Sequence, residues 1–99
     1  TLEFEWDPAK ARSNFRKHKV TFEEASTVFA DLYSVTAADP DHTTNEDRFL
    51  IIGFSRNNRL LLVSFAERRS RIRIISARTL TPRERINMKK PKTKENDTA

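Results

Sequence analysis

Glu67-Arg-Arg-Ser-Arg-Ile-Arg-Ile-Ile-Ser-Ala-Arg78 is the stretch of sequence that decides the fold. It places five arginines around an Ile-rich centre that has the composition and the period of a β-strand. Because alternate side chains of a strand point to opposite faces, Arg71 and Arg73 share one face, and the isoleucines that follow each of them share the other. One face of this strand can therefore pack in a core while the other carries charge.

The charged face is suited to binding phosphate. Guanidinium groups on a rigid sheet match phosphate oxygens with their forked donors and stay charged near neutral pH. A second interpretation stays open, in which the arginines are solvated and pair with acidic residues elsewhere in the sheet. Strict alternation also places Arg78 on the face opposite Arg71 and Arg73, so a common site requires a bulge or the end of the strand.

Length and composition limit the classes of protein. The 99 residues are enough for one compact domain, which we expect at residues 1–90. The chain has no cysteine and only two histidines, His18 and His42, which excludes disulfides and thiol nucleophiles and disfavours a zinc centre. We therefore expect no metal and no cofactor. The apolar runs are shorter than the about 20 residues that span a bilayer, and no secretory signal is recognised, so we expect a cytoplasmic protein without membrane contact.

Charge is distributed unevenly along the chain. The net charge is +5, but residues 21–47 carry seven acids and no base, whereas residues 67–99 carry eleven bases and four acids. Such segregation predicts a basic surface that binds a polyanion and an acidic surface elsewhere.

The N-terminal part predicts a short strand at residues 2–6 and two helices. Asp7 and Pro8 are typical of a helix start, because Asp accepts from free N–H groups and Pro needs no donor there. Thr21 and Glu24 have capping-box spacing at the start of the second helix. The first helix is expected to turn Ala11, Phe15 and His18 inward, and the second Phe22, Ala25, Val28, Phe29 and Leu32.

The remaining elements complete an α+β fold. Four further strands are expected at residues 33–38, 48–55, 60–68 and 71–78, with an acidic loop at 39–47 and a turn at 56–59. A last helix begins at Thr81 and runs to about residue 90, and residues 91–99 form a disordered Lys-rich tail. The order β-α-α-β-β-β-β-α indicates a small, mostly antiparallel sheet of about five strands, with an N-terminal helical hairpin on one face and a C-terminal helix.

Several blocks of the sequence resemble the BrnT toxin family. They are Phe4–Pro8, Lys17-His18, Val20–Ala25, Asp39–His42, Arg48-Phe49, Glu67-Arg68, Arg71–Arg78 and Arg83–Arg85. The resemblance covers residues 4–85. It implies a RelE-like fold and the ribonuclease half of a type II toxin–antitoxin pair, with cofactor-free RNA cleavage and inhibition of translation. It also implies a BrnA-like antitoxin that forms a hetero-oligomeric complex and supplies the contact with operator DNA.

On this interpretation the arginines act on an RNA phosphodiester. We assign Arg71, Arg73 and Arg78 to the phosphate, Glu67 as base or as the group that orients an arginine, and His18 or Lys17 as acid. Further RNA contacts are expected from Arg16, Lys17, Arg68, Arg83 and Arg85. Two structural alternatives stay open: Glu67 pairs with Arg68 or Arg71, and His18 is half-buried beside Ala11 and Phe15.

Two positions depart from the family pattern. The chain has Phe65-Ala66 where many members carry His-Thr, and Met88 where they often carry Tyr. These changes favour an alternative function, a weakened relative that binds nucleic acid or antitoxin without cleaving RNA. A DNA-binding repressor fits less well, because the basic charge lies on a predicted strand and no helix-turn-helix pair is recognised.

Overall fold

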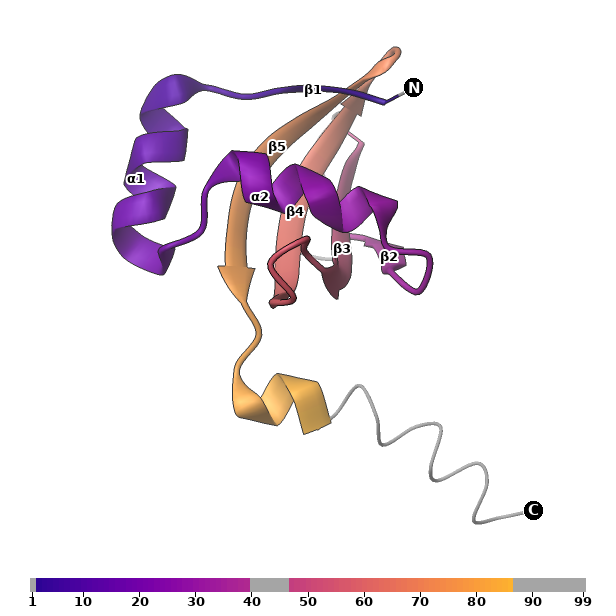
Figure 1. The fold of residues 1–99 in the computed structure, drawn as a ribbon. Helices are drawn as coiled ribbons and strands as arrows, with labels where there is room; N and C mark the ends of the chain where they lie inside the picture. Colours follow the sequence, from indigo (N-terminus) through magenta and orange to yellow (C-terminus); the bar gives the residue numbers. More distant parts are fainter. Residues whose placement is uncertain (1, 40–46, 87–99) are drawn as a thin grey trace, which may run out of the picture.

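The computed structural model of the chain describes residues 2–39 and 47–86 (Figure 1). The elements are β1 (Glu3–Glu5), α1 (Pro8–His18), α2 (Phe22–Thr27), the 3-10 helix η1 (Val28–Ala30), β2 (Val35–Ala38), β3 (Arg48–Phe54), β4 (Leu60–Arg68), β5 (Arg71–Thr79) and a helix at 82–86. This order confirms the predicted α+β fold. Residues 87–90 of the last predicted helix, the predicted tail and most of the acidic loop lie outside the described residues.

The five strands form one sheet in the order β1-β5-β4-β3-β2. Three neighbouring pairs are antiparallel, as predicted, and β1 runs parallel to β5. The parallel register sets Glu3 opposite Arg71 and Glu5 opposite Arg73. The first and last strands therefore meet at one edge and bring acidic and basic side chains together.

Strand β5 contains the bulge that the position of Arg78 requires. Ser64 of β4 pairs with Ser76, but the next residue, Phe65, pairs with Ile74, so Ile75 is the extra residue on β5. The extra residue reverses the alternation along the strand. As a result Arg78 joins Arg71 and Arg73 on one face, while Ile72, Ile74 and Ala77 are buried on the other.

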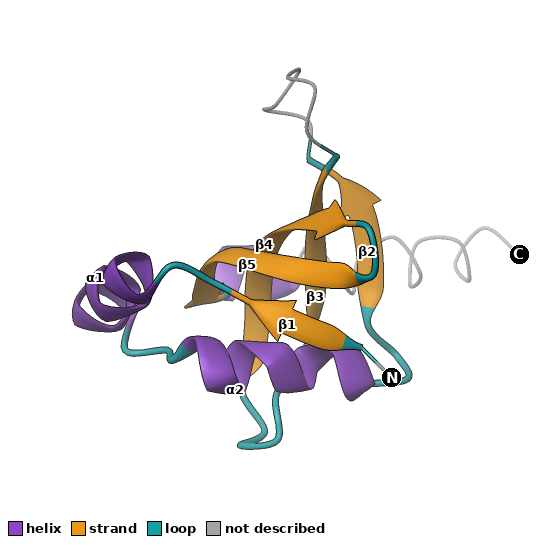
Figure 2. Cartoon of the chain, turned by 90° about the horizontal axis from the view of Figure 1, so that it is seen from above, coloured by secondary structure: helices purple, strands orange, loops and turns teal. Residues whose placement is uncertain are grey.

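Helix α2 and η1 cover one face of the sheet (Figure 2). Their apolar side chains pack on those of β3, β4 and β5, and the core comprises Val20, Phe22, Ala25, Val28, Ile51, Leu61, Val63, Phe65, Ile72, Ile74 and Ala77. Phe65 is 3% exposed and lies between Phe49 and Phe29, with ring centroids 5.6 and 4.9 Å away. The opposite face of the sheet carries Arg71, Arg73 and Arg78, and neither α2 nor η1 covers it; it is here called the helix-free face.

Helix α1 lies along the edge of β5, where β1 has ended, so the prediction that both helices lie on one face holds only for α2. Buried Asn14 donates to the carbonyls of Ala77 and Val20 and accepts from the N–H of Ala77, which satisfies the open edge of the strand. The predicted inward stripe is wrong in part, because Phe15 is 46% exposed and His18 is exposed. The side of α1 that faces β5 carries the polar Asn14, because the backbone groups at the open edge of the strand require hydrogen-bond partners.

The second helix is shorter than its apolar stripe predicted. It ends at Thr27 and continues as η1 to Ala30, so Leu32 is 93% exposed instead of packing in the core. Both predicted starts are confirmed, since Asp7 accepts from the N–H of Ala9 and Thr21 from that of Glu24. The last helix begins with a complete capping box, because Thr81 and Glu84 each accept from the other's N–H.

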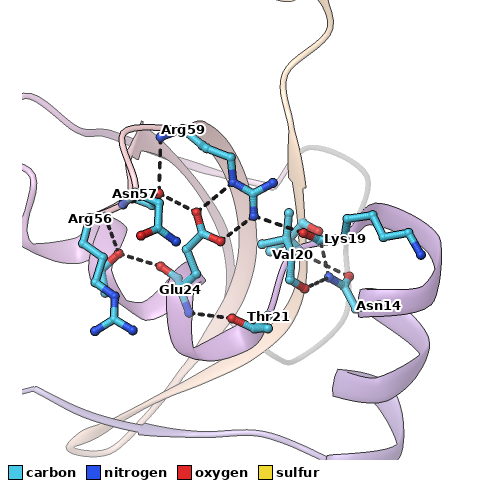
Figure 3. Close-up of polar contacts among 11 residues, drawn as sticks. Asn14, Lys19, Val20, Thr21, Glu24, Arg56, Asn57 and Arg59 are labelled. Atoms are coloured by element: carbon cyan, nitrogen blue, oxygen red, sulfur yellow. Dashed lines mark hydrogen bonds and ion pairs between the residues drawn. The ribbon is translucent and has the colours of Figure 1, made fainter.

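Glu24 does not close a capping box but binds the β3–β4 turn (Figure 3). Its carboxylate accepts from the Ser55 hydroxyl at 2.6 Å and from Nε of Arg59 at 2.9 Å, and it also pairs with the second arm of that guanidinium. Arg59 donates in addition to the carbonyl of Lys19. The hydrogen bonds from Arg59 lower the pKa of the buried Glu24 carboxyl to about 2. This cluster fastens α2 to the hairpin.

Candidate functional site

The helix-free face gathers arginines from three strands. Cross-strand register continues the row of Arg73 through Ala66 to Arg48, because residues directly opposite in a sheet share a face. Arg78 lies farther along β5 on the same face, opposite Leu62. Arg68 of β4 pairs with Arg71, so in the described part of the sheet five guanidinium groups project on the side away from α2.

Arg71 and Arg73 are held loosely by the acidic edge strand. Glu5 places one carboxylate oxygen 3.4 Å from each guanidinium, and Glu3 lies 3.4 Å from Nε of Arg71. Charge-assisted hydrogen bonds of good geometry are shorter, about 2.7–2.9 Å. The guanidinium groups are therefore oriented by β1 but keep donors for another oxyanion.

Arg78 is held more firmly. Its two terminal nitrogens each donate to Glu84 at 2.9 Å, a bidentate pair that links β5 to the last helix. These hydrogen bonds lower the pKa of the Glu84 carboxyl to about 2 and raise the pKa of Arg78. A phosphate that binds Arg78 would have to share or displace this carboxylate.

A small pocket with a mixed polar and apolar lining lies between α1 and the bulge of β5. It has a volume of about 190 Å³ and is lined by Lys10, Ser13, Asn14, Lys17, His18, Ile75 and Ser76. Ser76 follows the bulge and shares the helix-free face with Arg78, so the pocket borders that face. The structure thus brings the predicted residues Lys17 and His18 next to the arginine-bearing strand.

The structure separates other predicted site residues from this group. Glu67 pairs in register with the core residue Ile72, which places it on the helix-covered face, opposite Arg71 and Arg73. Its predicted grouping with the arginines is therefore corrected. Arg16 lines a different groove, between α1 and α2. Arg68, by contrast, pairs in register with Arg71 at the end of the β4–β5 hairpin and so shares the helix-free face.

Arg83 and Arg85 are exposed on the helix at 82–86. They lie on either side of Glu84 in sequence, and it is Glu84 that joins this helix to β5 by pairing with Arg78. Their predicted contact with RNA stays a prediction.

Sequence reasoning missed Glu5 and Lys10. The signal for Glu5 was available, because Glu3-Phe-Glu5 and Arg71-Ile-Arg73 carry opposite charges at the same alternate spacing. Recognising it required knowing that the first strand pairs with the last. Lys10 lies four residues before Asn14 and seven before Lys17, in the same stripe of α1, but nothing in the sequence indicated that this stripe faces β5.

The described residues were also compared with the patterns of a metal site and of a membrane-spanning helix. Residues 2–39 and 47–86 contain no cluster of three His, Cys, Asp or Glu side chains with the spacing of a metal site. In the same residues no helix is long and apolar enough to cross a bilayer. Phe65, where the sequence departs from the resembling family, lies in the core and does not reach the helix-free face, and Met88 lies outside the described residues.

Comparison with known proteins agrees with this architecture. The family model described as ribonuclease toxin, BrnT, of type II toxin–antitoxin systems matches residues 6–84. The crystal structure of the Brucella abortus ribonuclease toxin BrnT superposes with a TM-score of 0.61 and 23% identity, covering 82% of this chain and 99% of that one. No curated protein sequence matched. Because the family match spans most of the described fold, the chain belongs to the BrnT family of ribonuclease toxins.

Proposed function

We propose that this chain cleaves RNA by a metal-independent attack of the 2′-hydroxyl on the adjacent phosphorus, and that it thereby inhibits translation. The observation that carries this proposal is the bulge at Ile75, which gathers Arg71, Arg73 and Arg78 on the helix-free face. Guanidinium groups fixed in this way bind a phosphodiester and stabilise the negative charge that develops on its oxygens. The family membership supports a ribonuclease.

The reaction requires two proton transfers. A base takes the proton of the 2′-hydroxyl while its oxygen bonds to phosphorus, and an acid protonates the 5′-oxygen as the P–O bond breaks. The products are a 2′,3′-cyclic phosphate and a free 5′-hydroxyl. Each positioned acid or base typically contributes about 10²–10⁴ in rate, and one preorganised charge donor about 10²–10³.

Glu5 is better placed than Glu67 to act as the base. Its carboxylate lies between Arg71 and Arg73, where a bound phosphate would sit, whereas Glu67 lies on the other face of the sheet. His18, which lines the pocket beside β5, is the proposed acid, with Lys17 as the alternative. The predicted role of Glu67, as base or as the group that orients an arginine, stays a prediction that the Glu67→Gln variant tests.

The test compares five variants of the full chain. Arg71→Ala, Arg73→Ala, Arg78→Ala and Glu5→Gln should each lower the rate of cleavage of an RNA in EDTA, the arginine variants by about 10²–10³. Glu67→Gln should have a smaller effect. Arg56→Ala, an exposed arginine in the β3–β4 turn, is the matched control for lost charge. Wild-type rates for all three arginine variants, with unchanged thermal unfolding, would disprove the assignment.

A second function is supported by Phe65. Where many family members carry His, this chain has a buried phenylalanine, so a side chain that handles protons is absent from that position. A weakened relative that binds nucleic acid or antitoxin without cleavage fits this observation. Induction in a bacterial host separates the two functions, because a ribonuclease should arrest growth and a pure binder should not.

The proposed partners follow from the same surface. An antitoxin of the BrnA kind would neutralise the protein by covering the arginines with acidic side chains, and it would supply the contact with operator DNA. Such a complex is hetero-oligomeric. Co-expression with the adjacent small open reading frame should restore growth.

A further inference from the structure

We propose that the pocket between α1 and the β5 bulge binds a second backbone phosphate of the RNA, beside the phosphate held by the arginines of the helix-free face. This inference rests on the proposed function and names a further part of its substrate. The pocket is lined by Lys10, Ser13, Lys17, His18 and Ser76, together with Asn14 and Ile75.

The lining groups converge because of the helical period. Lys10, Asn14 and Lys17 follow one another at four and three residues, so they form one stripe of α1. Asn14 in this stripe is hydrogen-bonded to the backbone of Ala77, which turns the stripe toward β5 and fixes its distance from the strand. Lys10 and Lys17 therefore extend from a stripe of α1 that is fixed against the strand, and both line the pocket although their side chains are exposed.

The cations of the pocket differ from the arginines in having no counter-charge. Within residues 2–39 and 47–86, neither Lys10 nor Lys17 forms an ion pair or a side-chain hydrogen bond, and no carboxylate lines the pocket. Arg71, Arg73 and Arg78 all have glutamate partners. The positive charges of Lys10 and Lys17 have no carboxylate partner at the pocket. An anion bound there would therefore be stabilised by both charges.

Size and polarity indicate which anion fits. Pockets that enclose a whole small molecule are usually about 300–1,000 Å³ and mostly apolar. This pocket measures about 190 Å³ and offers ammonium, imidazole and hydroxyl groups. It therefore suits a single charged group, such as a phosphate with its ester oxygens, rather than a base.

The position of the pocket makes this phosphate a neighbour of the reacting one. Ser76 lies three residues after Arg73, so the two are separated by about 10 Å along the strand at about 3.3 Å per residue. A few nucleotides of single-stranded RNA span that distance. The backbone would run from Arg71 and Arg73, past the bulge, to the lysines of α1.

The test measures how binding depends on salt. The probe is a 2′-O-methyl RNA oligonucleotide, which binds but cannot be cleaved through its blocked 2′-oxygens. For single strands the slope of log affinity against log salt changes by about 0.7 for each phosphate contact. Lys10→Ala and Lys17→Ala should each reduce the slope by up to about this amount. The double variant, which removes both cations from the same phosphate, should reduce it by about 0.7 in total, with unchanged thermal unfolding.

The matched control is Arg12→Ala, which removes a cation from the opposite side of the same helix, where it lines the groove between α1 and α2. Its slope should equal that of the wild type. An unchanged slope in the lysine double variant, or an equal loss in Arg12→Ala, would overturn the inference. So would a double variant that binds RNA normally but no longer binds the antitoxin.

The outcome is distinguishable from failure of the proposed function. If the wild-type chain binds the probe with a slope that depends on Lys10 and Lys17 but cleaves no natural RNA, the phosphate site stands and the ribonuclease proposal falls. If cleavage depends on Arg73 while the lysines affect neither slope nor rate, the ribonuclease proposal stands and the second site falls.

Discussion

Two glutamate–arginine pairs of this protein, Glu24–Arg59 and Glu5–Arg73, differ in nearly every respect except their chemistry. The Glu24 side chain is 6% exposed and accepts hydrogen bonds from Ser55 and from two arms of one guanidinium. Glu5 and Arg73 are 27% and 33% exposed, lie 3.4 Å apart, and Glu5 is shared with Arg71. The Glu24 carboxylate is fully hydrogen-bonded within the fold, whereas the guanidinium groups of Arg71 and Arg73 keep N–H donors that a ligand can use.

The difference shows how burial decides the role of an ion pair. A buried charge that loses its partner is left uncompensated in a medium that solvates it poorly, which destabilises the fold strongly. An exposed pair contributes little to stability because water replaces either partner. A ligand can therefore exchange with Glu5 at little cost, while no ligand can take the place of Glu24.

Arg59→Ala should have the largest effect on stability. Breaking a buried pair typically costs about 3–5 kcal/mol, and the partial exposure of Arg59 places the expected loss toward the lower end. Urea unfolding measures this loss. Arg56→Ala, three residues earlier in the same turn, is the control and should change the free energy of unfolding by less than about 0.5 kcal/mol. Equal stability of the two variants would contradict the structural role of the cluster.

The second-largest effect is expected from acid, which should weaken the cluster of Glu24, Ser55 and Arg59. The pKa of Glu24 is lowered from 4.5 to about 2 in the folded protein, so its contribution is complete above the ordinary pKa and is lost as pH falls from about 5 toward 2. A shift of this size corresponds to about 3 kcal/mol. Unfolding at a series of pH values should show a steep decline over this range in the wild type and a shallower one in Arg59→Ala.

The sequence was sufficient to predict the elements of this fold because their signals are local. Asp7 and Thr21 accept the hydrogen bonds expected of helix caps, and Asn58 adopts the positive φ of 64° that the turn at 56–59 requires. Strands β3, β4 and β5 begin and end within a residue or two of their predicted bounds. Each of these features depends on residues close together in the chain.

The errors arose where a distant partner decided the outcome. Glu24 was expected to close a capping box and instead binds Arg59, 35 residues later. Glu67 was expected beside the arginines, but pairing with Ile72 places it on the other face. The gathering of Arg78 with Arg73 depended on a bulge that the Ile-Ile-Ser-Ala run alone did not locate. Alternation along one strand cannot reveal which strand lies beside it.

Glu84→Gln tests the Arg78–Glu84 pair, which is intermediate in exposure and geometry between Glu24–Arg59 and Glu5–Arg73. The bidentate pair with Arg78 has good geometry but is about one third exposed, so its loss should cost no more than about 1 kcal/mol. Because Arg78 would lose its carboxylate, its guanidinium would become more available to an RNA phosphate. The temperature of thermal unfolding should therefore fall while the affinity for the 2′-O-methyl RNA rises, both measured on the same sample. A large loss of stability would show that this pair belongs with Glu24–Arg59.

Glu5→Gln should have the smallest effect on stability and the most informative effect on function. The exposed pairs with Arg71 and Arg73 predict a change in the free energy of unfolding below about 0.5 kcal/mol. Removing the negative charge should leave affinity for the 2′-O-methyl RNA unchanged or raise it by up to about fivefold, since one unit charge at 4 Å in water corresponds to about 1 kcal/mol. Cleavage of natural RNA should nevertheless fall, because the amide cannot accept the 2′-hydroxyl proton. Glu3→Gln removes a carboxylate from the same strand that, among the described residues, pairs with Arg71 and not with Arg73, and it should keep the cleavage rate of the wild type. If both variants cleave equally well, Glu5 is a counter-ion of the arginines and not the base.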